Sequence, residues 1–407
     1  MGGGSLVLYN SAQGLSKLGY DVVIVTSVPH YPDGNVPPAY RNRFFTREFA
    51  DGIEVLRVWV PSVSSNGVKN RLILYSTFTM NYFVTMFLAG TFNAIYDIGL
   101  YPEFPAFSFP SYFHSRLRRV PWIFSSLDMW PDAVIDLGVV ESKLLHKLLY
   151  SFASTVDRLA DGITTITEAI KKGIVSRGVP ESKVHVVEMA VDTDYFKPIA
   201  KKDFTINTDI FSGKFVVEYS GIFGRAYDFD NILDAAKILE HQTDVLFLIR
   251  GDGELKQKIL IKIAKLNLRN VVVKGKVDAK IQVVEYLNAA DVLLIPMKNL
   301  KLSLTAVPSK VIEYLACGKP VICCAEGELA QLVTGSNVGV VTEPGNPQKL
   351  ADAIMLLRQD SAYRRKLGQN AREFALDRFT QDRMAQNLKR IISIQISRKK
   401  AGEKYLS

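Results

Sequence analysis

Short apolar runs alternate with longer amphipathic segments along most of the chain. The runs predict strands at 22–26, 54–60, 95–100, 122–126, 162–165 and 184–187, and then at 215–220, 245–250, 270–274, 292–296, 321–324 and 338–342. Helical periodicity lies between most of them, as at 232–240, 254–266 and 347–359. Apolar strands separated by helices are typical of parallel sheets covered by helices on both faces. The two series predict an α/β chain with two doubly wound, Rossmann-like domains.

The best domain boundary is a polar stretch at 197–213, where Pro198, two lysines and a Thr-Asn-Thr sequence interrupt the periodicity. We therefore expect an N-terminal domain over 1–197, a second domain over 198–380, and a final helix with a basic tail over 381–407. The chain starts with three glycines after Met1 and runs directly into a helical pattern at 6–18. We expect the first domain to lack the apolar strand that usually opens such a domain.

One segment, from Leu72 to Tyr96, carries no charged residue over 25 positions. That length is enough to span a bilayer. The segment is nevertheless interrupted by Ser, Thr and Asn side chains, which would face lipid or need partners in a spanning helix. The pattern favours a buried or interfacial helix over a membrane-spanning one.

The composition indicates a folded protein with large apolar cores, since 48% of the residues are hydrophobic and 22% are charged. The three cysteines (Cys317, Cys323 and Cys324) are too few and too clustered for a disulfide framework, which points to a reducing compartment. The five histidines are scattered, so we expect no metal site.

Most of the net charge of +9 lies at the C-terminal end. Residues 1–200 hold 18 basic and 18 acidic side chains, whereas residues 358–407 hold 13 basic and 5 acidic ones. A nucleic-acid-binding protein would more often place basic residues among exposed aromatics on a binding domain, so no nucleic-acid partner is predicted. A basic end beside a neutral body fits an anionic membrane surface, and it fits a solvated helix face equally well.

The densest group of chemically useful residues lies at 307–322, in the order loop, helix, turn and strand. Ser309 is the expected N-cap of the helix, and Glu313 then falls outside a capping box. The backbone amides and the positive dipole end of this helix, together with Lys310, suit a diphosphate. Glu313, one turn further on, is placed to accept hydrogen bonds from ribose hydroxyls. An ordinary surface helix is the structural alternative.

This stretch resembles the nucleotide-binding motif of glycosyltransferase family 4, whose members have the two-Rossmann GT-B fold, with two domains facing across a cleft. Further segments resemble the family's motifs in the expected order: 127–132, 191–198, 219–224, 248–254 and 286–292. The segment at 127–132 is similar to the Asp-Leu-Trp-Pro signature of the branch that builds surface polysaccharides and lipid-linked glycans. The resemblance covers nearly the whole chain except for the first strand.

The resemblance implies a site for a nucleoside diphosphate sugar, with UDP as the favoured nucleotide and no other cofactor. Glu313 would hold the ribose, and Ser309 and Lys310 would meet the diphosphate. The other implied donor-side residues are Gly4 of the N-terminal loop, Gly221, Gly224, Arg225, Arg250 and Thr305. On the acceptor side, Asp128 would lie near the transferred sugar, and His30 and Glu103 are further candidates. A histidine hydrogen-bonded only to backbone is an equal alternative for His30.

The implied activity is retaining, metal-independent hexosyl transfer to a glycan or polyprenyl-linked acceptor at the cytosolic membrane face. Helix ends and cationic side chains would neutralise the leaving diphosphate. The sequence departs from the family at Thr305, where a glutamate is common, and in having only Arg225 beside the glycine loop. These departures keep open a catalytically silent homologue that binds nucleotide or a partner. A sugar-nucleotide epimerase, which shares the architecture, is a further alternative.

Overall fold

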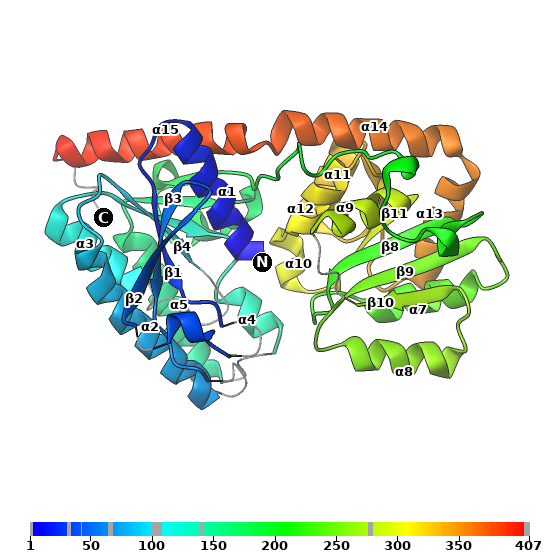
Figure 1. Cartoon of the computed structure of the whole chain (residues 1–407), viewed down its shortest axis with the longest axis horizontal. Coiled ribbons are helices and arrows are strands. Elements are labelled where there is room, and N and C mark those ends of the chain that lie inside the picture. The colour runs from blue at the N-terminus through cyan, green and yellow to red at the C-terminus, as the bar shows by residue number, and fades with distance from the viewer. Residues whose placement is uncertain are drawn as a thin grey trace. The chain divides into compact units, whose positions relative to one another are not determined.

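The chain folds into two α/β units (Figure 1), and each is described here by itself. The computed structural model describes residues 3–30, 34–41, 43–63, 68–99, 108–138, 140, 142–275 and 280–402. The first unit comprises residues 1–135, 140–187 and 381–407, and the second comprises 136–139 and 188–380. The α/β class with two Rossmann-like units is thus confirmed.

The second unit is built on a parallel sheet with the strand order β10-β9-β8-β11-β12-β13. Its strands are β8 (Phe215–Ile222), β9 (Val245–Asp252), β10 (Val271–Lys274), β11 (Val292–Pro296), β12 (Val321–Cys324) and β13 (Gly339–Thr342). The chain leaves β8 toward β9 and β10 and then returns to add β11 on the other side. The order therefore reverses between β8 and β11, the place where open α/β sheets bind their ligands beyond the carboxyl ends of the strands.

Helices connect these strands and cover the sheet (Figure 1, green to orange). They are α7 (Phe229–Ile238), α8 (Lys256–Leu266), α9 (Lys280–Ala289), α10 (Lys301–Thr305), α11 (Ser309–Ala316), α12 (Gly327–Gly335), α13 (Pro347–Gln359) and α14 (Ser361–Arg378). A buried apolar cluster joins β8, β9 and β11 to α7 and α13. The apolar runs that form β8, β9, β11 and β12 are therefore strands buried on both faces over most of their length, whereas β10 and β13 at the sheet edges are only partly buried.

The first unit has two sheets, a three-stranded one in the order β1-β3-β2 and a four-stranded one in the order β4-β5-β6-β7. The strands are β1 (Val23–Ser27), β2 (Phe45–Ala50), β3 (Ile53–Val58), β4 (Ile95–Gly99), β5 (Trp122–Ser126), β6 (Gly162–Thr165) and β7 (Val184–Val186). Among the described residues, β1 pairs only with β3, and β4 pairs only with β5. Each sheet thus ends in a strand with one open backbone edge, and the absence of an opening strand stays a prediction.

The helices of the first unit are α1 (Gly3–Lys17), α2 (Val68–Leu88), α3 (Phe109–Arg118), α4 (Asp132–Asp136), α5 (Lys143–Leu159), α6 (Glu168–Ser176) and α15 (Gln381–Lys400). The last helix, α15, packs on α1: Gln381 donates to Asn10 at 3.1 Å, and Lys17 donates back to Gln381 at 3.3 Å. The final helix therefore belongs to the same unit as the start of the chain.

Three features of the first unit differ from the sequence expectations or refine them. Strand β2 was not predicted; it pairs antiparallel with β3 across a turn in which Asp51 and Gly52 have φ angles of 49° and 80°. Gly3 and Gly4 are helical instead of forming a loop, because the helix of the following residues extends back through them and glycine permits right-handed φ and ψ. The uncharged segment forms α2 and the start of β4, and no helix in the described ranges is long and apolar enough to cross a membrane.

Candidate functional site

Two glycine-containing loops meet at the carboxyl ends of β8 and β9. Gly221 and Gly251 have φ angles of 145° and 137°, a backbone conformation that favours glycine. A Cβ added to Gly251 would lie 1.8 Å from the carbonyl oxygen of Gly221, and one added to Gly253 would lie 2.7 Å from that of Phe223. The two loops therefore pack backbone against backbone, and this backbone surface leaves no room for a Cβ at Gly251 or Gly253.

Helix α11 begins beside this surface. Its N-cap is Pro308, whose carbonyl accepts the first helical hydrogen bond from Val311 at 3.0 Å. The prediction of Ser309 as the N-cap is wrong by one position, since Ser309 is the first helical residue. No described side chain caps this end, so the amides of the first turn and the positive end of the dipole could bind an anionic ligand. Glu313 lies one turn into the helix, outside a capping box.

Lys310 projects from the first turn of α11 onto the glycine loop. Its Nζ atom donates a hydrogen bond to the Tyr219 hydroxyl at 2.7 Å and lies 3.8 Å from the ring centre of Tyr227. A Cβ added to Gly221 would lie 2.6 Å from the same Nζ atom. Burial lowers the pKa of Lys310 to about 7, and the charge of Glu313 opposes this shift. The ammonium is thus held by aromatic groups, and it forms no ion pair among the described residues.

Tyr314 attaches α11 to β8. Its hydroxyl donates to the carbonyl of Ser220 at 2.8 Å and accepts from the amide of Ser220 at 3.0 Å. Tyr314 is four positions after Lys310, so both side chains lie on the same face of the helix. The helix that carries Lys310 is therefore fixed in register against the glycine loop.

Arg250 occupies a different environment from the one expected. Its side chain is only 2% exposed, and its Nε atom lies 2.7 Å from a carboxylate oxygen of Glu218, which is fully buried. The guanidinium also donates to the Ser220 hydroxyl at 2.9 Å and stacks on Tyr286 at 4.3 Å. Since these groups already surround its charge, we leave Arg250 out of the proposed donor site.

Apart from Gly4, which lies in α1 of the first unit, the remaining predicted donor-side residues are in the second unit as well. Arg225 follows Gly224 on the β8–α7 loop and pairs with Glu254 at 3.1 Å in an exposed position. Thr305 is the last residue of α10, and its hydroxyl donates to the carbonyl of Leu302 at 3.2 Å. The structure thus brings Gly221 and Lys310 into contact, with Ser309 next to Lys310 on the same helix.

The predicted acceptor-side residues belong to the first unit. Asp128 follows β5, and burial raises the pKa of its carboxyl. Its backbone carbonyl accepts from the Ser126 hydroxyl and from the amide of Trp130, both at 3.0 Å. His30 follows β1, and its Nδ1 atom lies 2.9 Å from the carbonyl of Val28, the alternative considered from the sequence. Glu103 lies outside the described residues, and Gly4 is within α1.

The aromatic groups around Lys310 were missed by the sequence analysis. Tyr219 and Tyr227 come from β8 and the loop after it, so no local spacing links them to α11. For Tyr314 a signal exists, because it lies one helical turn after Lys310. Tyr219 and Tyr227 contact the Lys310 ammonium, and Tyr314 holds the helix that carries it. The sequence alone indicated only Lys310.

Comparison with known families assigns both halves of the chain. Residues 2–190 match the model of the glycosyl transferase 4-like domain, and residues 201–374 match that of the glycosyl transferases group 1. With its two Rossmann-like units, the fold is that of GT-B glycosyltransferases. The chain belongs to the group 1 glycosyltransferases of family 4, which confirms the resemblance seen in the sequence.

Individual proteins give a consistent picture. The WcaI protein of Escherichia coli K12, a glycosyl transferase assigned to colanic acid biosynthesis, is 23% identical over 84% of each chain. Other curated relatives are 27% identical, but the chain spans only 61% and 58% of their length. Sucrose-phosphate synthase of Thermosynechococcus elongatus superposes with a TM-score of 0.76 at 18% identity, covering 97% of this chain and 94% of that one. Anabaena HepE, solved with UDP-glucose, gives 0.66 at 17% identity, covering 91% and 99%.

Proposed function

We propose that the protein is a retaining glycosyltransferase that moves a hexosyl group from a nucleoside diphosphate sugar to a hydroxyl of a glycan or lipid-linked acceptor. The observation that carries the proposal is Lys310, an ammonium held by tyrosines beside the glycine loop at the uncapped start of α11. A partly buried cation that forms no ion pair with any described carboxylate, next to backbone amides, suits a diphosphate.

In this proposal the donor lies along the carboxyl ends of β8 and β11. The diphosphate contacts Lys310, Ser309 and the glycine loop, while Glu313 accepts hydrogen bonds from the ribose. Arg225 reaches the diphosphate by giving up its exposed ion pair with Glu254, because such a pair contributes little free energy in water. Thr305 faces the donor sugar, where a hydroxyl replaces the family's usual carboxylate.

The chemistry requires the bond between the anomeric carbon and the diphosphate oxygen to break while the acceptor oxygen bonds to the same carbon on the same face. Negative charge grows on the leaving diphosphate, and Lys310 and the start of α11 stabilise it. The leaving phosphate oxygen takes the proton of the acceptor hydroxyl, so no separate protein base and no metal ion are needed. Asp128, His30 and Glu103 belong to the acceptor side.

Two further observations support the finer assignment. UDP is favoured as the nucleotide because HepE, which shares the fold, was solved with UDP-glucose. A surface polysaccharide or lipid-linked glycan is favoured as the acceptor because WcaI is assigned to colanic acid synthesis. With the basic C-terminal end, these features support a protein that works at the cytosolic face of a membrane without spanning it.

Calorimetric titration with UDP and with GDP tests the donor site. The wild type should bind one of the two nucleotides, and Glu313→Gln should weaken that binding about tenfold through the loss of charge-assisted hydrogen bonds to the ribose. Glu373→Gln on the exposed side of α14 is the matched control and should bind as the wild type does. A folded wild type that binds neither nucleotide would contradict the proposal.

A nucleotide-binding homologue without activity is the second candidate, favoured by the engagement of Arg250 with Glu218, which leaves few cations for the diphosphate. Incubation with UDP-sugars and a membrane extract separates the two candidates. Transfer with retained anomeric configuration supports the enzyme, and tight binding without turnover supports the silent homologue. A changed donor sugar in the absence of acceptor would instead indicate the epimerase, which the family match disfavours.

A further inference from the structure

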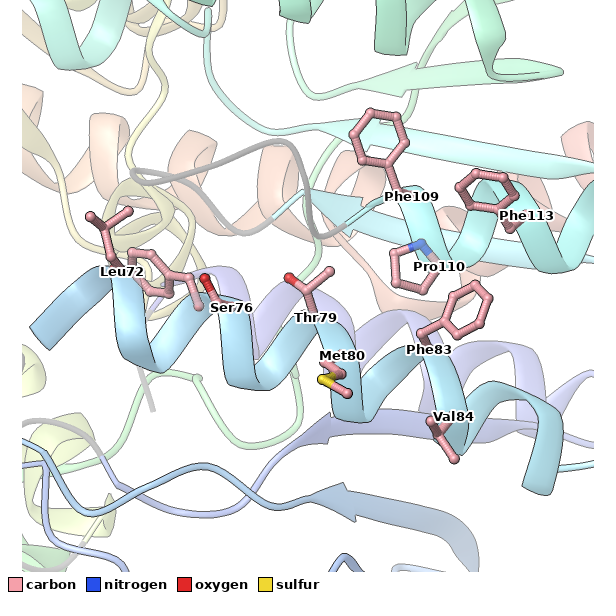
Figure 2. Close-up of a pocket in the computed structure, with 10 residues that line it drawn as sticks. Leu72, Ser76, Thr79, Met80, Phe83, Val84, Phe109, Pro110 and Phe113 are labelled. Atoms are coloured by element: carbon pink, nitrogen blue, oxygen red, sulfur yellow. The ribbon is translucent and has the colours of Figure 1, made fainter. Parts of the chain in front are cut away.

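An apolar groove runs between α2 and α3 in the first unit (Figure 2). Along one wall the α2 side chains extend from Leu72 to Val84, and Phe109 and Phe113 of α3 form the other wall. The groove encloses about 510 Å³, within the range of pockets that bind small ligands. Its polar lining is limited to groups such as the hydroxyls of Ser76 and Thr79. The groove therefore suits a hydrocarbon ligand.

The groove is not a product of ordinary core packing. One face of α2 is buried in the core of the unit through Tyr82 and Met86. The groove residues Met80 and Phe113 remain 72% and 54% exposed. Large contiguous apolar surfaces on a folded protein are uncommon unless they bind something. Phe83 and Phe113, with ring centres 6.2 Å apart, bring the two walls together at one end.

The two helices that form the groove carry only basic charged residues. Neither α2 nor α3 contains an acidic residue. Leu117 continues the Phe109–Phe113 face of α3 by one more turn, and Arg118 and Arg119 follow at the helix end. Arg116 is already paired with Asp161 at 3.2 Å. Arg118 and Arg119 are exposed and form no ion pair within the described part of the chain. Along the chain, the α3 wall of the groove is thus followed by two exposed guanidinium groups.

We propose that this groove binds the hydrocarbon chain of a long-chain lipid phosphate, with the phosphate at Arg118 and Arg119. The proposal deepens the proposed function, on which it rests, because it gives the lipid-linked acceptor a binding site. A single chain fits better than a bilayer surface because the apolar side chains line a hollow between two helices (Figure 2). Arginine suits the phosphate because its planar guanidinium can make paired hydrogen bonds.

Titration with geranylgeranyl phosphate, below the concentration at which it forms micelles, tests the groove. The wild type should bind this probe, and Met80→Asp should weaken binding about tenfold or more, because a carboxylate in the groove would have to be desolvated beside the chain. The matched control is Ile261→Asp on α8 of the second unit, a residue that is 66% exposed and should tolerate the change without effect. Both substituted positions are exposed, so both variants should fold.

The arginines are tested by changing the probe. A double variant, Arg118→Ala with Arg119→Ala, should lose about tenfold in affinity for geranylgeranyl phosphate, because the charged hydrogen bonds to the phosphate are lost and water screens those of exposed guanidinium groups. The same variant should bind geranylgeraniol, which has no phosphate, as tightly as the wild type does. Equal losses for both probes would overturn the assignment of the phosphate to this end of the groove.

Two results would overturn the groove as a chain site. One is equal affinity of wild type and Met80→Asp for geranylgeranyl phosphate. The other is a wild type that does not bind the free probe but sediments with phosphatidylglycerol vesicles, while Met80→Asp does not sediment with them. That result would make the surface a bilayer-docking face. UDP titration of the same proteins separates this test from that of the donor site. A wild type that binds lipid but not UDP refutes only the donor proposal, and the reverse refutes only the groove.

Discussion

Two cationic side chains approach β8, and their surroundings differ in one respect. Arg250 and Lys310 both pack on tyrosine rings, and both hydrogen-bond to residues of β8. Arg250 also has the carboxylate of Glu218 at 2.7 Å, whereas Lys310 forms no ion pair among the described residues. A buried charge with a partner serves the fold, and one without a partner is available to an anionic ligand. The contrast separates a structural cation, Arg250, from Lys310, the cation that we propose binds the donor.

The largest expected effect comes from removing the structural cation. Arg250→Ala leaves the Glu218 carboxylate buried and unpaired, so the free energy of unfolding should fall by about 3–5 kcal/mol. Urea denaturation measures this change. Replacing both partners, with Glu218→Leu and Arg250→Met, should recover most of the stability. If Arg250→Ala unfolds at the same urea concentration as the wild type, the structural role assigned to this pair is wrong.

An exposed pair in the same unit provides the reference for that experiment. Arg225→Ala breaks an ion pair with Glu254 in which both side chains are about half exposed. Its effect on the free energy of unfolding should stay below about 1 kcal/mol. A larger loss than that of Arg250→Ala would reverse the comparison.

Removing the ligand-binding cation should affect binding instead of stability. Lys310→Met should weaken UDP binding by about 1.5–3 kcal/mol, the usual worth of a hydrogen bond to a charged group. The urea midpoint should stay the same or rise, because a partly desolvated charge is replaced by an apolar chain. Calorimetry with UDP measures the loss, and Lys349→Met on α13 is the exposed control. Unchanged affinity would remove Lys310 from the donor site.

The next prediction concerns the point where the two glycine loops approach each other closely. Gly251→Ala places a Cβ 1.8 Å from the Gly221 carbonyl at a φ of 137°, so the backbone must shift. We expect a loss of about 1–3 kcal/mol in unfolding free energy, together with weaker UDP binding. Gly275→Ala is the matched control, because a Cβ there meets no atom within 4 Å. Equal behaviour of the two variants would show that the loops have room to move.

The last expected effect is a pH dependence of nucleotide affinity. Burial lowers the pKa of Lys310 to about 7 in the free protein, so the ammonium loses its proton as the pH rises above 7. Since the diphosphate binds the charged form, UDP affinity should fall by up to about tenfold per pH unit between pH 7 and 9. Lys310→Arg, whose guanidinium stays protonated, should flatten the profile. A flat profile in the wild type would mean that Lys310 keeps its proton throughout.

The strands that the sequence located well are those bounded by clear polar breaks. The predicted runs 122–126 and 292–296 coincide with β5 and β11, because both are fully buried; β11 is uniformly apolar, whereas β5 ends in two buried serines. Strand β2 was missed because Arg47 and Glu48 interrupt its apolar pattern on one edge of a sheet. The Asp51-Gly52 turn after it is a hairpin signal that would have located it.

The sequence by itself determined the two α/β units, the family, and the helix that carries Ser309, Lys310 and Glu313, because these depend on short-range spacing. Only the tertiary structure decided which cation serves the fold. Strand register aligns Glu218 with Leu248, so Arg250, two residues further along β9, emerges on the same face of the sheet as Glu218. Lys310 meets Tyr219 across 91 residues of sequence. Pairings of this kind depend on register and on helix docking, and local residue spacing does not encode either.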